Sequence, residues 1–333
     1  MLKNSICHFK KNFLLSLNMK IAILRRNGLG DLICTQPLIK FLQKKYPNAE
    51  ISLFIEQCNY ELAKYIYPDI SISVLPQGNK YLSIVKTALK FRKKNFDIAI
   101  SAKPSPMKLN NLFLWLLGAK KRYAVVAEQK WYSKLVNYPA NQEVIKGYHQ
   151  ALKVLRTFSP NVQSLPPDLF PTITLSNTST SIYSGEPLIL FSVSNNRKYS
   201  LINNKNLTLI SDKISEKYPT TKFIISAFPS DIHLAEDLTS RIGDNSKIVM
   251  CDSLNSFLAL LNNMTLIVVG DGGICHLSAA LKKKLVALYG VTKPENWSPL
   301  ASKDMCITLY DPENVNNIAL AKITDAIFSL LEK

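Results

Sequence analysis

The stretch "KIAILRRNGLGDLICTQPLIKFLQKKYP", residues 20–47, leads from a predicted strand into a predicted helix. Residues 20–24 are short and rich in branched apolar side chains, which is typical of a strand buried on both faces. From residue 32 onward apolar side chains recur at helical spacing until Pro47 ends the segment. Ligands of open α/β sheets bind outside the carboxyl ends of strands, so the turn at residues 25–31 is a candidate functional segment.

Strand and helix patterns alternate along the rest of the chain, which indicates α/β architecture with doubly wound parallel sheets. Strands are predicted at residues 49–56, 70–76, 96–102, 122–126, 187–194, 222–228, 247–252, 265–271 and 284–290. The periodicity fails between residues 165 and 187, where prolines and the polar run "SNTSTS" indicate a linker. We therefore expect an N-terminal extension at 1–18, a first Rossmann-like domain at 19–175, a linker at 176–187 and a second such domain at 188–333.

The basic charge is concentrated in one half of the chain. The 333 residues have a formal net charge of +17, and residues 1–150 alone hold 24 Lys and Arg against 8 Asp and Glu. This asymmetry suggests that the first half meets a polyanion, which would be nucleic acid, an anionic membrane surface, or a phosphorylated and carboxylated substrate. The alternative is a solvated basic face that maintains solubility.

Other classes of protein are less consistent with the sequence. The six cysteines are scattered without a C-x-x-C pair, which favours a reducing compartment and argues against a zinc site. No run approaches the ~20 apolar residues of a membrane-spanning helix. Residues 1–18 lack a signal-peptide cleavage pattern, so we expect an upstream start or a tail, with a membrane-surface anchor as the alternative. The apolar run at residues 112–117 predicts a buried helix, or else one that lies on a membrane.

A second chemical turn lies in "LIVVGDGGICHLSAALKKKLVALYGVTKPENW", residues 266–297. A buried strand is expected to end at Asp271, and Gly272 and Gly273 lead into a helix whose free N–H groups favour a phosphate. His276, one turn inside, would add a donor, and Thr292 follows the next strand at the same edge of the sheet. The alternative is structural, with Asp271 as a helix cap and the glycines as a tight turn.

Together, residues 19–47 and 270–297 resemble glycosyltransferase family 9, the ADP-heptose:lipopolysaccharide heptosyltransferases. The resemblance implies a GT-B architecture, in which two Rossmann-like domains face one another across a cleft. It further implies that the C-terminal domain holds the nucleotide-sugar and the N-terminal domain holds the acceptor. Transfer in the family is inverting and needs neither a metal nor a cofactor.

The resemblance assigns the acceptor side of the reaction to the first turn. Inverting transfer needs a base to take the proton of the attacking hydroxyl, and Asp31 matches the family's proposed base. Gly28 and Gly30 would let the acceptor come close, and Arg25 and Arg26 would attract its anionic groups. The alternative is that Asp31 only caps the following helix.

The donor side is assigned to the second domain. Gly272, Gly273 and His276 match the family's glycine-rich helix start, beside Asp271 and Thr292. The chain has no Asp-x-Asp motif of the kind that holds a metal, and the family instead uses a basic side chain after the domain's first strand.

That basic side chain is the main departure from the family. In "SVSNNRKYS", residues 192–200, Arg197 aligns with the family's lysine, but Lys198 is an equally basic neighbour. The family's glycine in this loop is replaced by Asn195 or Asn196, and Gly272 replaces its usual Ser or Thr. Asp231 stands where an acidic family residue contacts the nucleotide ribose, or else acts as a helix cap.

The resemblance therefore predicts an ADP-heptose donor and an anionic glycolipid acceptor, the inner core of lipopolysaccharide. It places the enzyme in the cytoplasm, peripheral to the inner face of the inner membrane. One alternative is a family member with another nucleotide-sugar donor or another glycan acceptor. A non-catalytic polyanion-binding protein is more remote, because no nucleic-acid-binding motif is present. A nicotinamide-dependent dehydrogenase is a weak rival, because "NGLGD" is not G-x-G-x-x-G.

Overall fold

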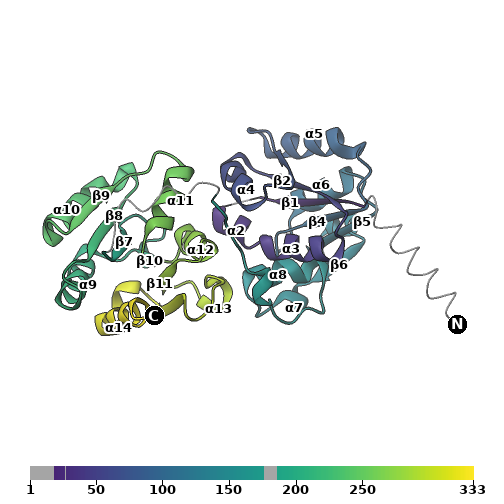
Figure 1. Cartoon of the computed structure of the whole chain (residues 1–333). Coiled ribbons are helices and arrows are strands. Elements are labelled where there is room, and N and C mark those ends of the chain that lie inside the picture. Colours follow the sequence, from purple (N-terminus) through teal and green to yellow (C-terminus); the bar gives the residue numbers. More distant parts are fainter. Residues whose placement is uncertain (1–18, 27, 176–185) are drawn as a thin grey trace. The chain divides into compact units, whose positions relative to one another are not determined.

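The chain forms two compact units in a computed structural model, which describes residues 19–26, 28–175 and 186–333 (Figure 1). Unit 1 is Met1–Leu169 and unit 2 is Phe170–Lys333. The predicted extension at 1–18 and most of the predicted linker, residues 176–185, lie outside the described residues.

Unit 1 is built on a parallel sheet of six strands in the order β3-β2-β1-β4-β5-β6. In the register of the central strands, Leu24 of β1 lies opposite Phe54 of β2 and Ser101 of β4. The strands are β1 (Lys20–Arg25), β2 (Glu50–Ile55), β3 (Ser71–Val74), β4 (Ile98–Ser101), β5 (Lys121–Val126) and β6 (Tyr138–Asn141). The α-helices are α2 (Leu29–Ile33), α3 (Gln36–Lys45), α4 (Tyr60–Ile66), α5 (Lys80–Arg92), α6 (Lys108–Leu116), α7 (Gln142–Ile145) and α8 (Gln150–Phe158). Short 3-10 turns are η1 (Gln57–Asn59), η2 (Trp131–Leu135) and η3 (Pro167–Leu169).

Unit 2 repeats the same arrangement, with strands in the order β12-β11-β10-β7-β8-β9, all parallel. Its strands are β7 (Leu188–Ser192), β8 (Lys222–Ser226), β9 (Ser246–Val249), β10 (Leu266–Gly270), β11 (Lys284–Gly290) and β12 (Cys306–Asp311). Its α-helices are α9 (Asn204–Lys217), α10 (Ile232–Ile242), α11 (Leu254–Asn263), α12 (Gly273–Ala280), α13 (Pro294–Trp297) and α14 (Leu320–Leu331). Its 3-10 turns are η4 (Lys198–Ser200), η5 (Pro229–Asp231) and η6 (Val315–Asn317). The predicted α/β fold class with two doubly wound parallel sheets is thereby confirmed.

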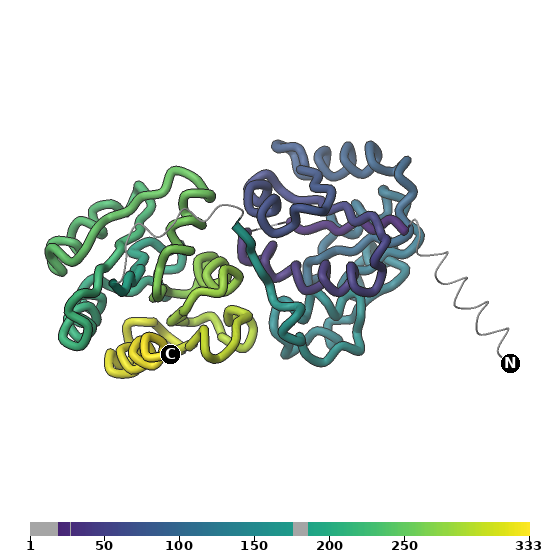
Figure 2. The backbone as a smooth tube through the Cα atoms, in the orientation of Figure 1, coloured from purple at the N-terminus to yellow at the C-terminus, as the bar shows by residue number. Residues whose placement is uncertain are grey.

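Each core consists of the apolar strand faces and the helices that cover them. In unit 1 the buried ring of Phe54 meets Phe91, Phe96 and Phe113 edge-to-face, at centroid distances of 5.0, 6.2 and 5.1 Å. In unit 2 the last helix, α14, packs on α9 and on strands β10, β11 and β12. Figure 2 follows the backbone of each unit through these elements.

Two strands, β6 and β12, escape the sequence pattern. Both are edge strands, and β6 includes Pro139, which has no N–H to donate and is tolerated in a sheet only at an edge or a bulge. A strand that pairs on one side needs fewer buried apolar side chains, so its sequence signal is weak.

The apolar run at residues 112–117 forms most of α6 and is half buried. Phe113 and Leu114 are fully buried, whereas 48% of Trp115 is exposed. Within the described ranges, we find no helix with both the length and the apolar character needed to cross a bilayer.

The strand orders fix where ligands bind. In unit 1 the order reverses between β1 and β4, and in unit 2 between β7 and β10. At such a switch point the loops that follow the two strands diverge to opposite faces and leave a crevice at the carboxyl ends. The turn at residues 25–31 follows β1, and Asp271 follows β10, so both chemical turns of the sequence lie at switch points.

The switch point of unit 2 depends on two glycines without room for a side chain. A Cβ on Gly270 would overlap the carbonyl oxygen of Ser200, and a Cβ on Gly290 would overlap that of Tyr199 and lie 3.0 Å from the Val315 nitrogen. By contrast, a Cβ on Gly272 would meet its nearest atom at 3.8 Å. The loop after β7 therefore rests directly on the ends of β10 and β11.

We predict that Gly290→Ala destabilises the chain, because the added Cβ must displace the backbone of residues 199–200. The expected loss is about 1–3 kcal/mol in the free energy of unfolding, measured by urea unfolding. Gly272→Ala is the matched control, since its Cβ has ordinary contacts and its backbone is extended. Equal midpoints for the two variants would show that the close approach is not a constraint.

Candidate functional site

In unit 1 the turn after β1 places Asp31 in the first turn of α2. The N-cap of that helix is Gly28, which has an extended backbone (φ −67°, ψ 174°) and makes no side-chain cap hydrogen bond. Asp31 therefore does not cap the helix, and the capping alternative is wrong. Its carboxylate oxygen Oδ1 is paired instead with Arg25, and 17% of its side chain is exposed.

Arg25 is fully buried at the end of β1. One guanidinium nitrogen donates to the carbonyl oxygen of Ala102, which follows β4, and the other is paired with Asp31. Burial lowers the pKa of Arg25 to about 10, so the side chain still carries its charge at neutral pH. The pair therefore ties the turn after β1 to the end of β4, across the switch point.

This burial corrects the expectation that Arg25 contacts the acceptor. A side chain without exposed surface cannot reach a ligand, and the terminal nitrogens Nη1 and Nη2 of Arg25 are engaged by Ala102 and Asp31. We therefore describe Arg25 as a residue that positions Asp31. This burial has no local sequence signal, because a strand-end arginine is usually a surface charge.

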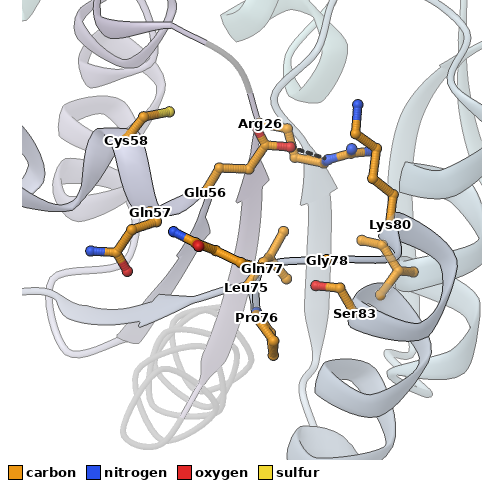
Figure 3. A pocket seen from close by; sticks show the side chains of 11 residues that line it. Arg26, Glu56, Gln57, Cys58, Leu75, Pro76, Gln77, Gly78, Lys80 and Ser83 are labelled. Atoms are coloured by element: carbon orange, nitrogen blue, oxygen red, sulfur yellow. Dashed lines mark hydrogen bonds and ion pairs between the residues drawn. The ribbon is translucent and has the colours of Figure 1, made fainter.

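Arg26 points to another part of the same edge. Its Nε donates to Glu56 at 2.9 Å, and both residues line a cavity of about 260 Å³ (Figure 3). The cavity lies at the ends of β1, β2 and β3 and at the start of α5, and its other lining residues include Gln57, Gln77 and Lys80. Arg26 and Lys80 thus bring basic groups to a hollow beside the turn.

Lys103 is a further candidate site residue, one that was not predicted from the sequence. It follows Ala102 at the end of β4, and burial together with the positive charge of Arg25 lowers the pKa of its amine. Nearby, the buried Asn110 of α6 donates to the hydroxyl of Ser101 at 2.9 Å. The sequence signal for Lys103 is its place directly after the predicted strand "FDIAISA", at the edge where ligands bind.

In unit 2 the loop after β7 meets the turn after β10 through an ion pair. Arg197 is paired with Oδ2 of Asp271, whose side chain is 2% exposed, whereas 51% of Arg197 is exposed. The N-cap of α12 is Gly272 and lacks a side-chain cap bond, so the alternative in which Asp271 caps the helix is wrong. A buried carboxylate requires such a partner, and the pair brings two predicted site residues together.

Asn195 fixes this loop. Its Nδ2 donates to the carbonyl oxygens of Asp271, at 3.0 Å, and Ser200, at 3.3 Å, while its Oδ1 accepts from the Arg197 N–H at 2.9 Å. The side chain therefore connects the loop after β7 to the turn after β10 and to η4. In the sequence, Asn195 was notable only as a departure from the family's usual glycine.

The start of α12 is the expected anion site. Gly272 has an extended backbone and Gly273 begins a helix of eight residues. His276 is buried in its second turn, with its ring 6.2 Å from that of Trp297 in an edge arrangement. The helix start therefore presents backbone N–H groups beside Arg197.

Thr292 and Asp231 lie at the same edge of the second sheet. The Thr292 N–H donates to the Gly290 carbonyl oxygen across Val291, whose φ of 61° is a strained value for a β-branched residue. Asp231 holds the N-cap position of α10 without a cap hydrogen bond from its side chain, so its alternative role as a cap is not seen.

Exposed apolar side chains follow two further strands of unit 2. Phe228, after β8, is 50% exposed, and Met250, after β9, is 54% exposed. Lys198 is also exposed, but no ion pair involves it within the described ranges. Exposed apolar groups at the ligand-binding edge of a sheet are a surface for a flat apolar ligand group. Neither Phe228 nor Met250 was singled out from the sequence.

The cysteines do not form a reactive or metal-binding cluster in the part of the chain that the structure describes. Burial raises the pKa of Cys34 to about 12 and that of Cys275 well above its usual value. Both thiols are therefore neutral packing residues.

Comparison with known sequences finds similarity to the proteins of one family. The sequence model described as glycosyltransferase family 9 (heptosyltransferase) matches residues 233–323, which include the turn from Asp271 to His276. A lipopolysaccharide heptosyltransferase 1 of Campylobacter coli is 21% identical over 336 residues, which cover 89% of this chain and 97% of that protein.

Comparison with solved structures gives the fold. A family 9 glycosyltransferase of Veillonella parvula is similar with a TM-score of 0.80 at 16% identity, covering 96% of this chain and 99% of that one. The E. coli heptosyltransferase WaaC, solved with ADP, is similar with a TM-score of 0.72 at 16% identity, covering 94% and 100%. The sequence matches and the shared fold therefore support a family 9 glycosyltransferase, and the family-model match itself lies within unit 2.

Proposed function

We propose that the chain transfers a heptose from ADP-heptose to the inner core of lipopolysaccharide, with inversion at the anomeric carbon. One observation carries the proposal: each unit holds one half of the required chemistry at its topological switch point. Unit 1 presents a partly exposed carboxylate, Asp31, and unit 2 presents a partly exposed cation, Arg197, beside a helix start.

The donor belongs to unit 2 in this proposal. The diphosphate lies at the start of α12, where N–H groups and the guanidinium of Arg197 meet its charge. The pairing of Arg197 with Asp271 neutralises a buried carboxylate that would otherwise repel phosphate, and the guanidinium has further N–H donors to offer. Asp231 meets the ribose, and Phe228 and Met250 offer apolar surface to the adenine.

The acceptor belongs to unit 1. Its sugar hydroxyl approaches Asp31 over Gly28, around which a Cβ would find no atom within 4 Å. The basic groups of Arg26 and Lys80 at the neighbouring cavity receive its carboxylates or phosphates. Such an acceptor also accounts for the concentration of positive charge in the first 150 residues.

The reaction then proceeds in one displacement. The acceptor oxygen attacks the anomeric carbon and forms the new glycosidic bond, while the bond from that carbon to the diphosphate oxygen breaks. Asp31 takes the hydroxyl proton, and Arg25 holds the carboxylate in place. ADP leaves with the electron pair, and Arg197 and the start of α12 stabilise its developing charge. We further propose that the enzyme works in the cytoplasm at the membrane that holds its acceptor.

A second candidate is the same reaction with another nucleotide-sugar. Asn195 stands where the family has glycine, and Gly272 provides no hydroxyl group to a phosphate. Both changes lie in the donor half, so they bear on the donor more than on the chemistry.

We predict that Asp31→Asn lowers turnover by about 10²–10⁴-fold, because the amide cannot take the hydroxyl proton. ADP affinity should be unchanged, since unit 2 binds the nucleotide. Turnover is measured with a soluble, deacylated inner-core acceptor and ADP-heptose. Asp69→Asn, an exposed carboxylate of the same unit, is the control. Turnover by Asp31→Asn within a few-fold of the parent would overturn the assignment of the base.

We predict that Arg197→Ala weakens ADP binding by about tenfold or more, because at least one charged hydrogen bond to the diphosphate is lost. Arg197→Lys should keep most of the affinity, and Lys198→Ala should keep nearly all of it, because Lys198 is not paired with Asp271. Calorimetry with ADP, UDP and GDP measures this. A larger loss for Lys198→Ala would reverse the assignment, and a preference of the parent for UDP or GDP would favour the second candidate.

We predict that Gly272→Ser strengthens ADP binding by about two- to tenfold, because the hydroxyl adds a donor to the phosphate at a position with room for a side chain. Gly272→Ala separates this effect from that of the added Cβ. Equal affinities for the two variants would show that the phosphate does not lie at this residue.

A further inference from the structure

A band of exposed apolar and basic side chains crosses α5, α6 and η2 of unit 1, and we name it the α5–α6 face. Its apolar members are 48–57% exposed, which is unusual for side chains of this size. They are Tyr81, Leu82, Leu89, Trp115 and Trp131. Its exposed basic members are Lys86, Lys90, Arg92, Lys93, Lys108, Lys130 and Lys134.

Contacts between the three elements make the band continuous. Helices α5 and α6 pack side by side, and α6 packs against η2 (Figure 1). The Lys108 amine lies 5.5 Å from the ring centres of both Tyr81 and Trp131, which joins the starts of all three elements. At the other end, Arg92 donates to the carbonyl oxygen of Leu116 at 3.1 Å.

Helical spacing then places the remaining members on the outer side. Leu82, Lys86, Leu89 and Lys93 follow one stripe of α5, opposite its buried residues Ile84 and Ala88. On α6, Lys108 and Trp115 are two turns apart on the side away from the buried Phe113 and Leu114. Apolar and basic side chains thus alternate over one surface.

The charge on this part of the chain is nearly of one sign. Between residues 80 and 134 there are 13 Lys and Arg but only two acidic residues, Asp97 and Glu128. Asp97 is already paired with Lys120. A surface of this kind attracts an anionic partner along its whole length.

We propose that the α5–α6 face docks unit 1 onto an anionic lipid surface. Half-exposed tryptophan and tyrosine rings suit the boundary between headgroups and acyl chains, and the lysines around them meet the headgroup charge. A folded protein partner would be expected to bury a charge-poor centre, whereas here lysines stand between the aromatic rings. A single-stranded nucleic acid is the remaining anionic partner, and it is an outcome of the test.

The face reaches the edge of the sheet that holds Asp31. Tyr81 and Lys108 begin helices that follow β3 and β4, and Trp131 follows β5, so their cluster lies near the carboxyl ends of the strands. The cavity with Arg26 is lined by Lys80 and Ser83 of the same helix α5. Docking would therefore hold the base close to the headgroups, a consequence that rests on the proposed lipid-anchored acceptor.

The test is co-sedimentation of the full chain with vesicles of phosphatidylcholine alone or with about one third phosphatidylglycerol. We expect binding to the anionic vesicles that falls with salt, and little binding to the neutral ones. Trp115→Ala with Trp131→Ala, and separately Lys86→Glu with Lys93→Glu, should each weaken binding about tenfold or more. Tyr310→Ala and Lys303→Glu with Lys322→Glu, exposed positions of unit 2, are matched controls that should leave binding unchanged.

Three results would overturn the proposal. They are the absence of binding to anionic vesicles, equal binding by the face variants and the parent, and displacement from vesicles by a short single-stranded RNA that binds to the same face more tightly. Circular dichroism and the urea-unfolding midpoint of each variant, compared with those of the parent, show that it is folded. Vesicle binding is read without turnover, so it stands or falls separately from the reaction. If the reaction is also as proposed, the face variants lose turnover on a vesicle-borne acceptor but keep it on a soluble one.

Discussion

Unit 2 depends on the close approach of one loop to two strand ends. The loop at residues 195–200 lies on Gly270 and Gly290 with no room for a Cβ at either position. Because the backbone comes this close, Asn195 can bridge the loop to Asp271, and the side chain of Arg197 reaches the same carboxylate. The proposed anion site at α12 thus combines segments more than seventy residues apart in the chain. They can come this close because Gly270 and Gly290 have no side chain.

Each unit has an ion pair between an arginine and an aspartate at its switch point, but the partner that is exposed differs between the two units. In unit 1 the arginine is buried and the carboxylate is partly open, whereas in unit 2 the carboxylate is buried and the arginine is half open. Each unit offers the charge that its proposed task requires, a proton acceptor for a hydroxyl and a cation for a diphosphate. The buried partner keeps the exposed one oriented.

The sequence predicts most of this fold because buried parallel strands are near-continuous apolar runs, as in "KIAIL" and "LIVVG". It fails at β6 and β12, edge strands whose pairing is one-sided. At the site, Asp31 and Asp271 can be predicted because each follows a predicted strand. Their ion pairs with Arg25 and Arg197 cannot be predicted in the same way. Tertiary packing determines the rest, and local spacing does not encode it. It buries Arg25, it places Asn195 where it links two loops, and it leaves Phe228 and Met250 exposed.

The separate strand orders have a consequence for how the chain folds during synthesis. Every strand of the first sheet pairs within unit 1, and β7 is the first strand of the second. The first sheet needs no later segment of the chain for its strand pairing. It can therefore fold on the ribosome before the second sheet is translated. The second sheet, like the first, pairs its fourth strand with its first, so β10 joins β7 only after β8 and β9 have been made. Because β10 comes late in the chain, this central pairing and the proposed anion site form among the last events of folding.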